Sequence, residues 1–234
     1  RTTKIAALIF FPLASAPVAV SYLLYANQAR PIRTIAEAGE VRIVEVARQR
    51  FVLTIGSVVA DVSYLADHEA LQQFLTEGKA EFFHRLGAHY LAFARHRPFF
   101  DQVSFIGAAG KTVVQIDRTG ATAALAAPGQ RQDETNRDEI QRALTLDRGQ
   151  IFVSEMDLNF ENGAIQQRVK PTIRIAAPVF DQAGERRGTV IVHYLAQHIL
   201  DRIKDLERQA GEIWLLSSDG RWLHGPGPDA FALI

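Results

Sequence analysis

The sequence contains no cysteine among its 234 residues. This absence excludes a disulfide framework, thiolate catalysis and cysteine-based zinc sites. An excess of one charge is also lacking: 26 Lys and Arg balance 26 Asp and Glu, so no broad field attracts phosphates and nucleic acid is not an expected partner. No Gly-x-Ser-x-Gly elbow, Walker loop or Rossmann fingerprint occurs. We therefore predict a chain that is not an enzyme and uses no cofactor.

A long apolar run without charged residues lies near the N-terminus, over residues 5–26. A helix of about 22 residues spans roughly 33 Å, enough for a hydrocarbon core of about 30 Å. We predict a retained transmembrane helix at 5–26, preceded by a cytoplasmic end at 1–4. The alternative is a cleaved signal peptide, with Ala14-Ser15-Ala16 as the cleavage site. Since the chain starts at Arg1 and stops at Ile234, we expect a piece of a longer protein.

A second long helix is predicted by apolar residues that recur at helical spacing from Pro31 to about Leu75. We assign residues 27–78 to a stalk. A helix of this length needs a partner to bury its apolar stripe. Either it lies against its own domain, or it pairs with a second protomer in a homodimer and carries motion to the membrane. Asp67 is a candidate N-cap for a short helix that follows.

Another helix is expected from Lys79 to about Arg97, with three histidines in or near it. The spacings between His84, His89 and His96 are five and seven residues, whereas a helical zinc site favours i, i+4 pairs. We interpret these histidines as surface or core residues and predict no metal site.

After Pro98 the apolar period changes from 3.6 to 2, which predicts a sheet. Five strands are expected, at 100–106, 112–117, 150–154, 172–180 and 188–194, with helices at 138–146 and 196–208. The segment 157–167 reads as a polar loop. The order of elements predicts an α+β fold with a five-stranded, mainly antiparallel sheet. This layout resembles that of PAS-like domains.

The most specific stretch lies between Gly149 and Tyr194. Gly149-Gln-Ile-Phe-Val-Ser-Glu-Met-Asp-Leu-Asn159 is followed by Lys170-Pro-Thr-Ile-Arg-Ile-Ala-Ala-Pro-Val-Phe-Asp181. These blocks resemble the double-Cache periplasmic sensor region of bacterial membrane-bound histidine kinases and diguanylate cyclases. The strands at 100–117 are similar to the first hairpin of that family. The hairpin expected around Asp219-Gly220 is similar to the start of its second module.

The resemblance implies a domain organisation and a location. Residues 79–208 would form the membrane-distal Cache domain, and 209–234 the truncated start of the membrane-proximal one. The sensor domain would be periplasmic, held by the bacterial inner membrane, and a second membrane helix and a cytoplasmic signalling domain would follow in the longer protein.

The resemblance also implies a small-molecule ligand, bound between the sheet and its covering loops. Alternation on 172–177 places Arg174 with Thr172 and Ala176 on one face. Arg174 either grips an acidic ligand or forms a structural pair with Asp157 or Glu161. The full set of candidate ligand-binding residues is Arg174, Gln115, Asp117, Ser104, Ser154, Asp157 and Asn159.

Relatives often carry arginine on both strands of the first hairpin, and here Ser104 and Gln115 stand at those positions. This difference removes two candidate anion-binding groups. Asp157 with Glu161 as a catalytic acid/base pair is disfavoured, because carboxylates in a polar loop are usually solvated or hydrogen-bonded. We therefore expect the input domain of a membrane receptor. The rival hypothesis is a membrane-tethered periplasmic module that binds a protein partner.

Overall fold

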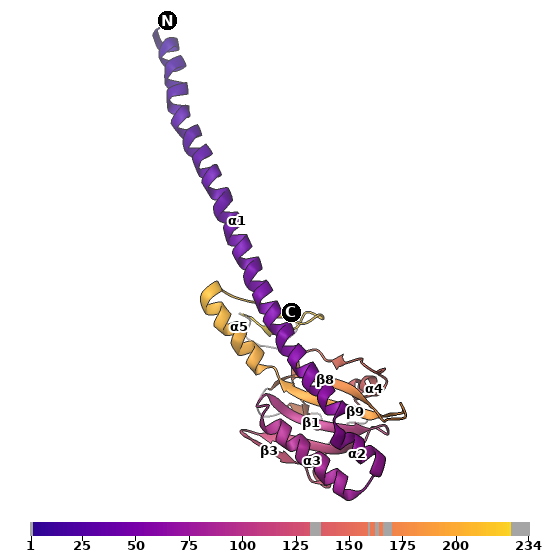
Figure 1. The fold of residues 1–234 in the computed structure, drawn as a ribbon. Coiled ribbons are helices and arrows are strands. Elements are labelled where there is room, and N and C mark those ends of the chain that lie inside the picture. Colours follow the sequence, from indigo (N-terminus) through magenta and orange to yellow (C-terminus); the bar gives the residue numbers. More distant parts are fainter. Residues whose placement is uncertain (1, 132–136, 159, 162–163, 166–169, 226–234) are drawn as a thin grey trace. The chain divides into compact units, whose positions relative to one another are not determined.

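A computed structural model describes residues 2–131, 137–158, 160–161, 164–165 and 170–225. Within these ranges, the side chains of 2–16, 19, 23–38, 158, 160–161, 164–165 and 209–210 are not described. The chain divides into two compact units, Arg1–Arg48 and Gln49–Ile234. The first unit is helical, and the second contains the sheets and the remaining helices (Figure 1).

Three helices come first. Helix α1 spans Thr2–Asp67, α2 spans Glu69–Glu77 and α3 spans Ala80–Arg95. The helix expected to run to about Leu75 therefore ends at Asp67. The N-cap of α2 is His68 rather than Asp67, because the His68 Nδ1 accepts a hydrogen bond from the Ala70 amide.

Among the residues that the structure describes, no helix is both long and apolar enough to cross a membrane. Within the expected membrane segment 5–26, side chains are described only at 17–18 and 20–22. The backbone of 5–26 is helical, but most of the side chains on which the membrane prediction depends lie outside the described ones.

The main sheet is antiparallel and has seven strands. Six follow the order β3-β2-β1-β9-β8-β4, and β5 pairs with β8 beside β4. The long strands are β1 (Phe100–Gly107), β2 (Thr112–Thr119), β8 (Pro171–Phe180) and β9 (Arg186–Leu195). The short ones are β3 (Thr122–Leu125), β4 (Phe152–Val153) and β5 (Asp157–Leu158).

The α+β class and the antiparallel sheet are confirmed, and the strand count of five is corrected. The sequence prediction lacked β3, which pairs with β2, and β5, which lies in the expected polar loop. That loop also contains β6 (Phe160–Glu161) and β7 (Ala164–Ile165). The other elements are the 3₁₀ turn η1 (Pro128–Gln130), α4 (Asp138–Leu144), α5 (Gln197–Ala210) and the hairpin β10 (Leu215–Leu216) with β11 (Trp222–His224).

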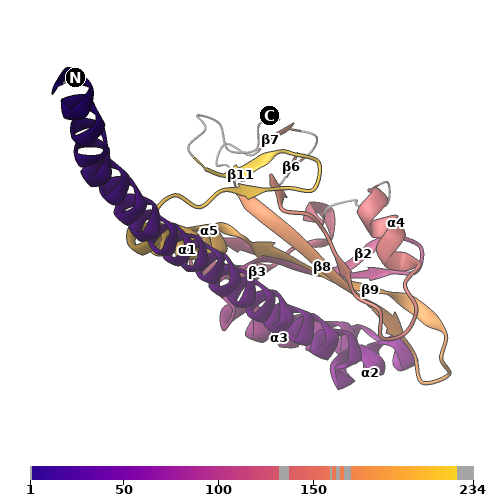
Figure 2. The ribbon, with the colours of Figure 1, turned by 90° about the horizontal axis from the view of Figure 1, so that it is seen from above.

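The two faces of the main sheet have different coverings. One, the α3 face, shares the large apolar core with α1, α2, α3 and α5. Its strand residues include Val103, Phe105, Val114, Ile116, Ile173, Ile175, Val190 and Val192. The other, the α4 face, carries a smaller cluster in which Ile106, Ala176 and Ile191 meet Ile140 and Ala143 of α4. Figure 2 shows α3 and α4 on opposite sides of the sheet.

A buried arginine of β2 joins the end of α3 to the start of β1. The Arg118 side chain donates from Nε to the Phe100 carbonyl at 2.9 Å and from Nη2 to the carbonyls of Arg97, at 3.2 Å, and Ala94. These contacts satisfy carbonyl groups that the helix end leaves without intrahelical partners, and they place a cation at the negative end of the helix dipole. Arg118 therefore fixes where the sheet begins relative to α3.

Strands β1 and β9 approach so closely that one position requires glycine. Gly188 faces Gly107 across this pair and has φ 147°. A Cβ atom at Gly188 would lie 2.0 Å from the Ile106 carbonyl oxygen. The close contact of the two central strands depends on this missing side chain.

Candidate functional site

A row of polar side chains crosses four neighbouring strands on the α4 face. Asp117 of β2 lies opposite Gln102 of β1, Gln102 lies opposite His193 of β9, and His193 lies opposite Arg174 of β8. Directly paired residues place their Cβ atoms about 4.5–5.5 Å apart. Asp117 is half-buried and the other three are buried. We call these four residues the polar row.

The next row along the strands is mixed. Ser104 of β1 lies between Gln115 of β2 and Ile191 of β9, and Ile191 pairs in turn with Ala176 of β8. This row is polar at the β2 and β1 end and apolar at the β9 and β8 end. Small-molecule sites combine such groups, because polar groups orient the ligand and apolar groups exclude water.

The carboxylates that contact Arg174 come from two elements. Its Nη1 lies 3.0 Å from both carboxylate oxygens of Asp157, on β5, and 3.3 Å from Oε2 of Glu139, on α4. The Arg174 side chain is 4% exposed, so the ion pairs are screened little by solvent. Two carboxylates therefore lie against this one cation, and the positive charge of Arg137 is also close to the row.

Among the buried polar atoms of these rows, Nε2 of Gln102 and Oγ of Ser104 have no hydrogen-bond partner in the described part of the chain, and their residues are 6% and 1% exposed. Leaving a buried donor unsatisfied costs about 1–3 kcal/mol, so native proteins keep few such groups. Gln102 and Ser104 are adjacent on the same face of β1, and both can donate to a bound molecule.

The histidine of the polar row is neutral at physiological pH. Burial holds the pKa of His193 well below its ordinary value, and the nearby positive charges of Arg174 and Arg137 lower that pKa further. A neutral imidazole has one donor and one acceptor nitrogen. The row therefore presents a cation, a neutral ring, an amide and a carboxylate, in that order.

The carboxylate at the other end of the row is held by its neighbour on the same strand. Gln115 donates from Nε2 to both oxygens of Asp117, at 2.8 and 3.0 Å. The amide therefore orients the carboxylate toward the face that both side chains share.

Most of the predicted site residues come together. Arg174, Gln115, Asp117 and Ser104 lie in the two rows, and the expected ion pair between Arg174 and Asp157 is present. The alternation predicted for 172–177 matches the two core clusters, since Ile173, Ile175 and Ala177 belong to the α3 face and Ala176 to the α4 face.

One of the predicted residues is placed differently, and another is not described. Ser154 supports the backbone, because its Oγ accepts from the Arg174 amide at 2.9 Å and donates to the Glu155 carbonyl at 2.7 Å. Asn159 lies outside the described residues, as does the Glu161 side chain.

Three members of the site were missed by sequence reasoning: Gln102, His193 and Glu139. A signal was available for the first two. Each is a polar residue inside an otherwise apolar strand, at a position that alternation assigns to the face of Ser104 or Ile191. Glu139 had no comparable signal, because α4 is a short polar helix.

Metal ligation has no candidate in the described part of the chain, where no three or more His, Asp or Glu side chains gather in a suitable group. Of the histidines near α3, His89 stacks on His68 with ring centroids 3.4 Å apart.

A separate cavity of about 300 Å³ opens on the α3 face, beside Tyr194 and Phe100. The polar row is not part of it, since the side chains of consecutive strand residues such as His193 and Tyr194 point to opposite faces of the sheet. We treat the row as the main candidate site because it gathers charged and unsatisfied groups in the sheet interior.

Comparison with protein families gives one match over most of the chain. The family described as the sensor domain of bacterial histidine kinases matches residues 42–230. No curated protein matches the sequence.

Solved structures with the same fold include sensory domains of several receptors. A domain of a sensory box/GGDEF family protein from Vibrio parahaemolyticus has a TM-score of 0.69 at 17% identity, with 82% of this chain and 74% of that chain covered. The extracellular domain of the histidine kinase vpHK1S-Z8 has a TM-score of 0.64 at 19% identity, with coverages of 81% and 70%.

The sensory domain of the Campylobacter jejuni chemoreceptor Tlp3, solved with isoleucine bound, has a TM-score of 0.59 at 13% identity, with coverages of 80% and 69%. At identities this low, the TM-scores establish a shared fold and nothing more. They carry no assignment of ligand.

Proposed function

This chain belongs to the family of bacterial histidine kinase sensor domains, and on that premise we propose that its polar row and the adjacent mixed row bind a small zwitterionic molecule of the amino-acid class. The observation that carries the proposal is the pair of buried, unsatisfied groups on Gln102 and Ser104. A ligand between the sheet and its covering segments would satisfy both.

The charge pattern favours a zwitterion over a simple anion. Asp117, Asp157 and Glu139 offer carboxylate oxygens to an ammonium group, while Gln102 and Ser104 offer donors to a carboxylate. Arg174 is already engaged by two carboxylates, so it adds little free positive charge. Ile191 and Ala176, packed against Ile140 and Ala143 of α4, border the rows with an apolar cluster. The isoleucine in the Campylobacter chemoreceptor structure is consistent with this class of ligand.

We further propose that the domain works outside the cytoplasmic membrane as the input of a receptor. Residues 5–26 would anchor it, 27–78 would form the stalk, 79–208 the ligand-binding domain and 209–234 the start of a second Cache module. The output would be a histidine kinase or a diguanylate cyclase. Exposed apolar side chains on α1 support pairing of two stalks, among them Val41, Val44, Val52 and Leu53. A ligand can shift such a receptor only by binding one state better than the other.

A thermal-shift experiment on the full chain in detergent micelles tests the binding proposal. The probes are isoleucine, glutamate, arginine and 4-aminobutyrate. Ligand at a hundred times Kd adds about 2.7 kcal/mol, which raises Tm by roughly 5–10 °C for a domain of this size.

The discriminating variant is Gln102→Leu, with Gln72→Leu as its matched control. Gln102→Leu removes an amide that has an unsatisfied donor, so the variant should fold and lose at least about tenfold in affinity. Gln72 donates to the Phe180 carbonyl at 3.0 Å, away from the rows. Its variant should be less stable and keep the full ligand response. If no probe raises Tm, or if both variants respond alike, the proposal is wrong. Capture of a periplasmic protein instead would favour a protein-binding module.

A further inference from the structure

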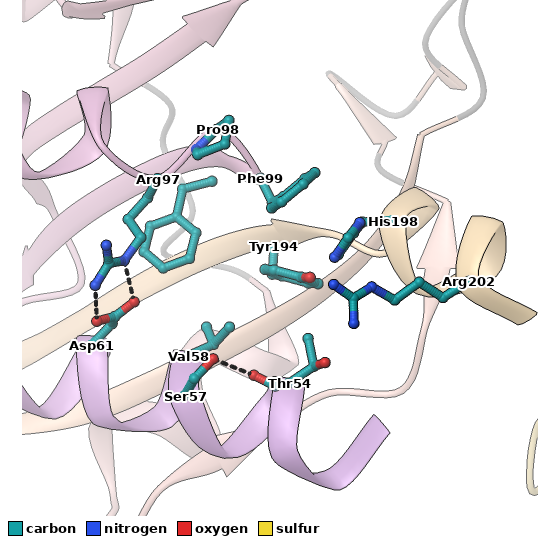
Figure 3. Close-up of a pocket in the computed structure, with 11 residues that line it drawn as sticks. Thr54, Ser57, Val58, Asp61, Arg97, Pro98, Phe99, Tyr194, His198 and Arg202 are labelled. Carbon is teal, nitrogen blue, oxygen red and sulfur yellow. Dashed lines mark hydrogen bonds and ion pairs between the residues drawn. The ribbon is translucent and has the colours of Figure 1, made fainter. Parts of the chain in front are cut away.

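The cavity on the α3 face lies where three parts of the second unit meet. Helix α1 contributes Thr54 and Val58, the α3–β1 turn contributes Arg97 and Phe99, and α5 contributes His198 and Arg202. Tyr194, at the end of β9, forms its floor (Figure 3). The volume of about 300 Å³ is at the lower end of the range for small-molecule sites.

The wall of the cavity is aromatic and partly open to solvent. Phe99 is 39% exposed, so part of its ring is accessible from solvent. Its ring stacks on the His198 ring with centroids 4.1 Å apart and an interplanar angle of 16°. The Tyr194 ring lies 6.3 Å from Phe99. The planes of Phe99 and Tyr194 are 56° apart, so the rings form an angled platform that can contact an apolar group on two sides.

The charge in the cavity is unbalanced. Arg97 is neutralised by Asp61, which accepts from its Nε at 2.6 Å and from its Nη2 at 2.8 Å. Arg202 has no ion-pair partner among the residues described. Figure 3 shows its guanidinium beside the Tyr194 hydroxyl and below His198. Burial lowers the pKa of His198, and the charge of Arg202 lowers it further, so the ring is neutral and does not share the positive charge.

We propose that this cavity is a second binding site, for a small organic anion with a flat apolar body such as an aromatic carboxylate. The Arg202 guanidinium has the fork geometry that matches a carboxylate. The Phe99 and Tyr194 rings would cover the apolar body. This site lies on the α3 face, opposite the polar row, and shares no residue with that row. The proposal is therefore independent of the proposed amino-acid site.

The location gives the second site a regulatory role. Its occupant contacts α1, which continues toward the N-terminus, and α5, which leads to the β10–β11 hairpin. A molecule that touches both helices stabilises one placement of them over others. The site would therefore act on α1, which contains most of the proposed stalk.

Titration calorimetry on the full chain in detergent micelles tests the proposal with two probes, benzoate and its neutral isostere benzamide. Benzoate should bind, and benzamide should bind at least about tenfold more weakly, because a charge-assisted hydrogen bond is lost. Arg202→Gln should remove that preference. The matched control is Arg208→Gln on the same helix, where the arginine is 80% exposed and paired with Asp205. This control should bind benzoate as the wild type does.

Two further variants separate this site from the polar row. Phe99→Ala should weaken both probes, because it removes one side of the platform. Gln102→Leu should leave benzoate binding unchanged. The proposal is overturned if benzoate shows no binding at concentrations up to the millimolar range, about 100 times the protein concentration. It is also overturned if benzamide binds as tightly as benzoate. A third contradicting result is that Gln102→Leu weakens benzoate binding as much as Arg202→Gln does.

Discussion

Ser104→Ala and Thr189→Val each remove one buried hydroxyl from the α4 face of the sheet, and we predict stability changes of opposite sign. Ser104 is 1% exposed and its Oγ has no partner among the described residues. Thr189 is 0% exposed, and its Oγ1 donates to the Ala177 carbonyl at 2.9 Å. The two sites therefore match in burial and differ in hydrogen bonding.

The magnitudes follow from that difference. An unsatisfied buried hydroxyl costs about 1–3 kcal/mol, so its removal in Ser104→Ala should raise the free energy of unfolding by about 1 kcal/mol or more. Loss of a made hydrogen bond costs about 0.5–1.5 kcal/mol, so Thr189→Val should lower the same quantity. For a domain of 150–250 residues, each kcal/mol moves Tm by about 2–4 °C.

Urea denaturation of both variants without ligand measures these changes, with the m-value as a check that the unfolded state is unaltered. Bound ligand should reduce the stability advantage of Ser104→Ala over the wild type. The wild-type hydroxyl gains a contact with the ligand that the variant cannot make. If Ser104→Ala destabilises the protein as much as Thr189→Val does, the Ser104 hydroxyl is already satisfied in the free protein and the reasoning fails.

Three other perturbations test the fold around the site. Arg118→Met should lower the free energy of unfolding by about 2–4 kcal/mol in urea denaturation, because the carbonyls that end α3 lose their buried donor; an effect below about 0.5 kcal/mol would contradict this. Gly188→Ala should cost at least about 2 kcal/mol or prevent folding, since its Cβ would meet the Ile106 carbonyl oxygen at 2.0 Å, and a soluble variant with unchanged Tm would refute the close approach. The lowered pKa of His193 means that the unfolded chain binds the proton more readily, so stability should fall as pH drops below about 6.5, by up to about 1.4 kcal/mol per pH unit; His193→Gln should flatten the slope between pH 8 and 5.

Local patterns in the sequence predicted much of this fold. Alternation in 172–180 and 188–194 predicted β8 and β9, and the helical period after Tyr194 predicted α5. Strand β3 was missed because Thr122-Ala-Ala-Leu125 lacks the β-branched alternation of a strand and forms by pairing with β2. The N-cap prediction at Asp67 indicated a break within one residue of the true one, but the stalk was extended to 78 because no glycine or proline marks the end of α1.

The candidate site could be predicted only in part, because it depends on register. Gln115, Ser104 and Arg174 were visible as polar residues within strands. The pairing of β1 with β9 brings Gln102 and His193 together between the two ends of the polar row. These strands are about 90 residues apart in the chain. No local pattern encodes such a pairing.

The most direct test of the polar row as a binding site is a crystal structure of the chain with the amino acid that gives the largest thermal shift. We predict that a polar atom of the ligand lies within about 3.2 Å of Gln102 Nε2 or Ser104 Oγ, on the α4 face of the sheet. A ligand found on the α3 face instead, with both groups still unsatisfied, would contradict the account.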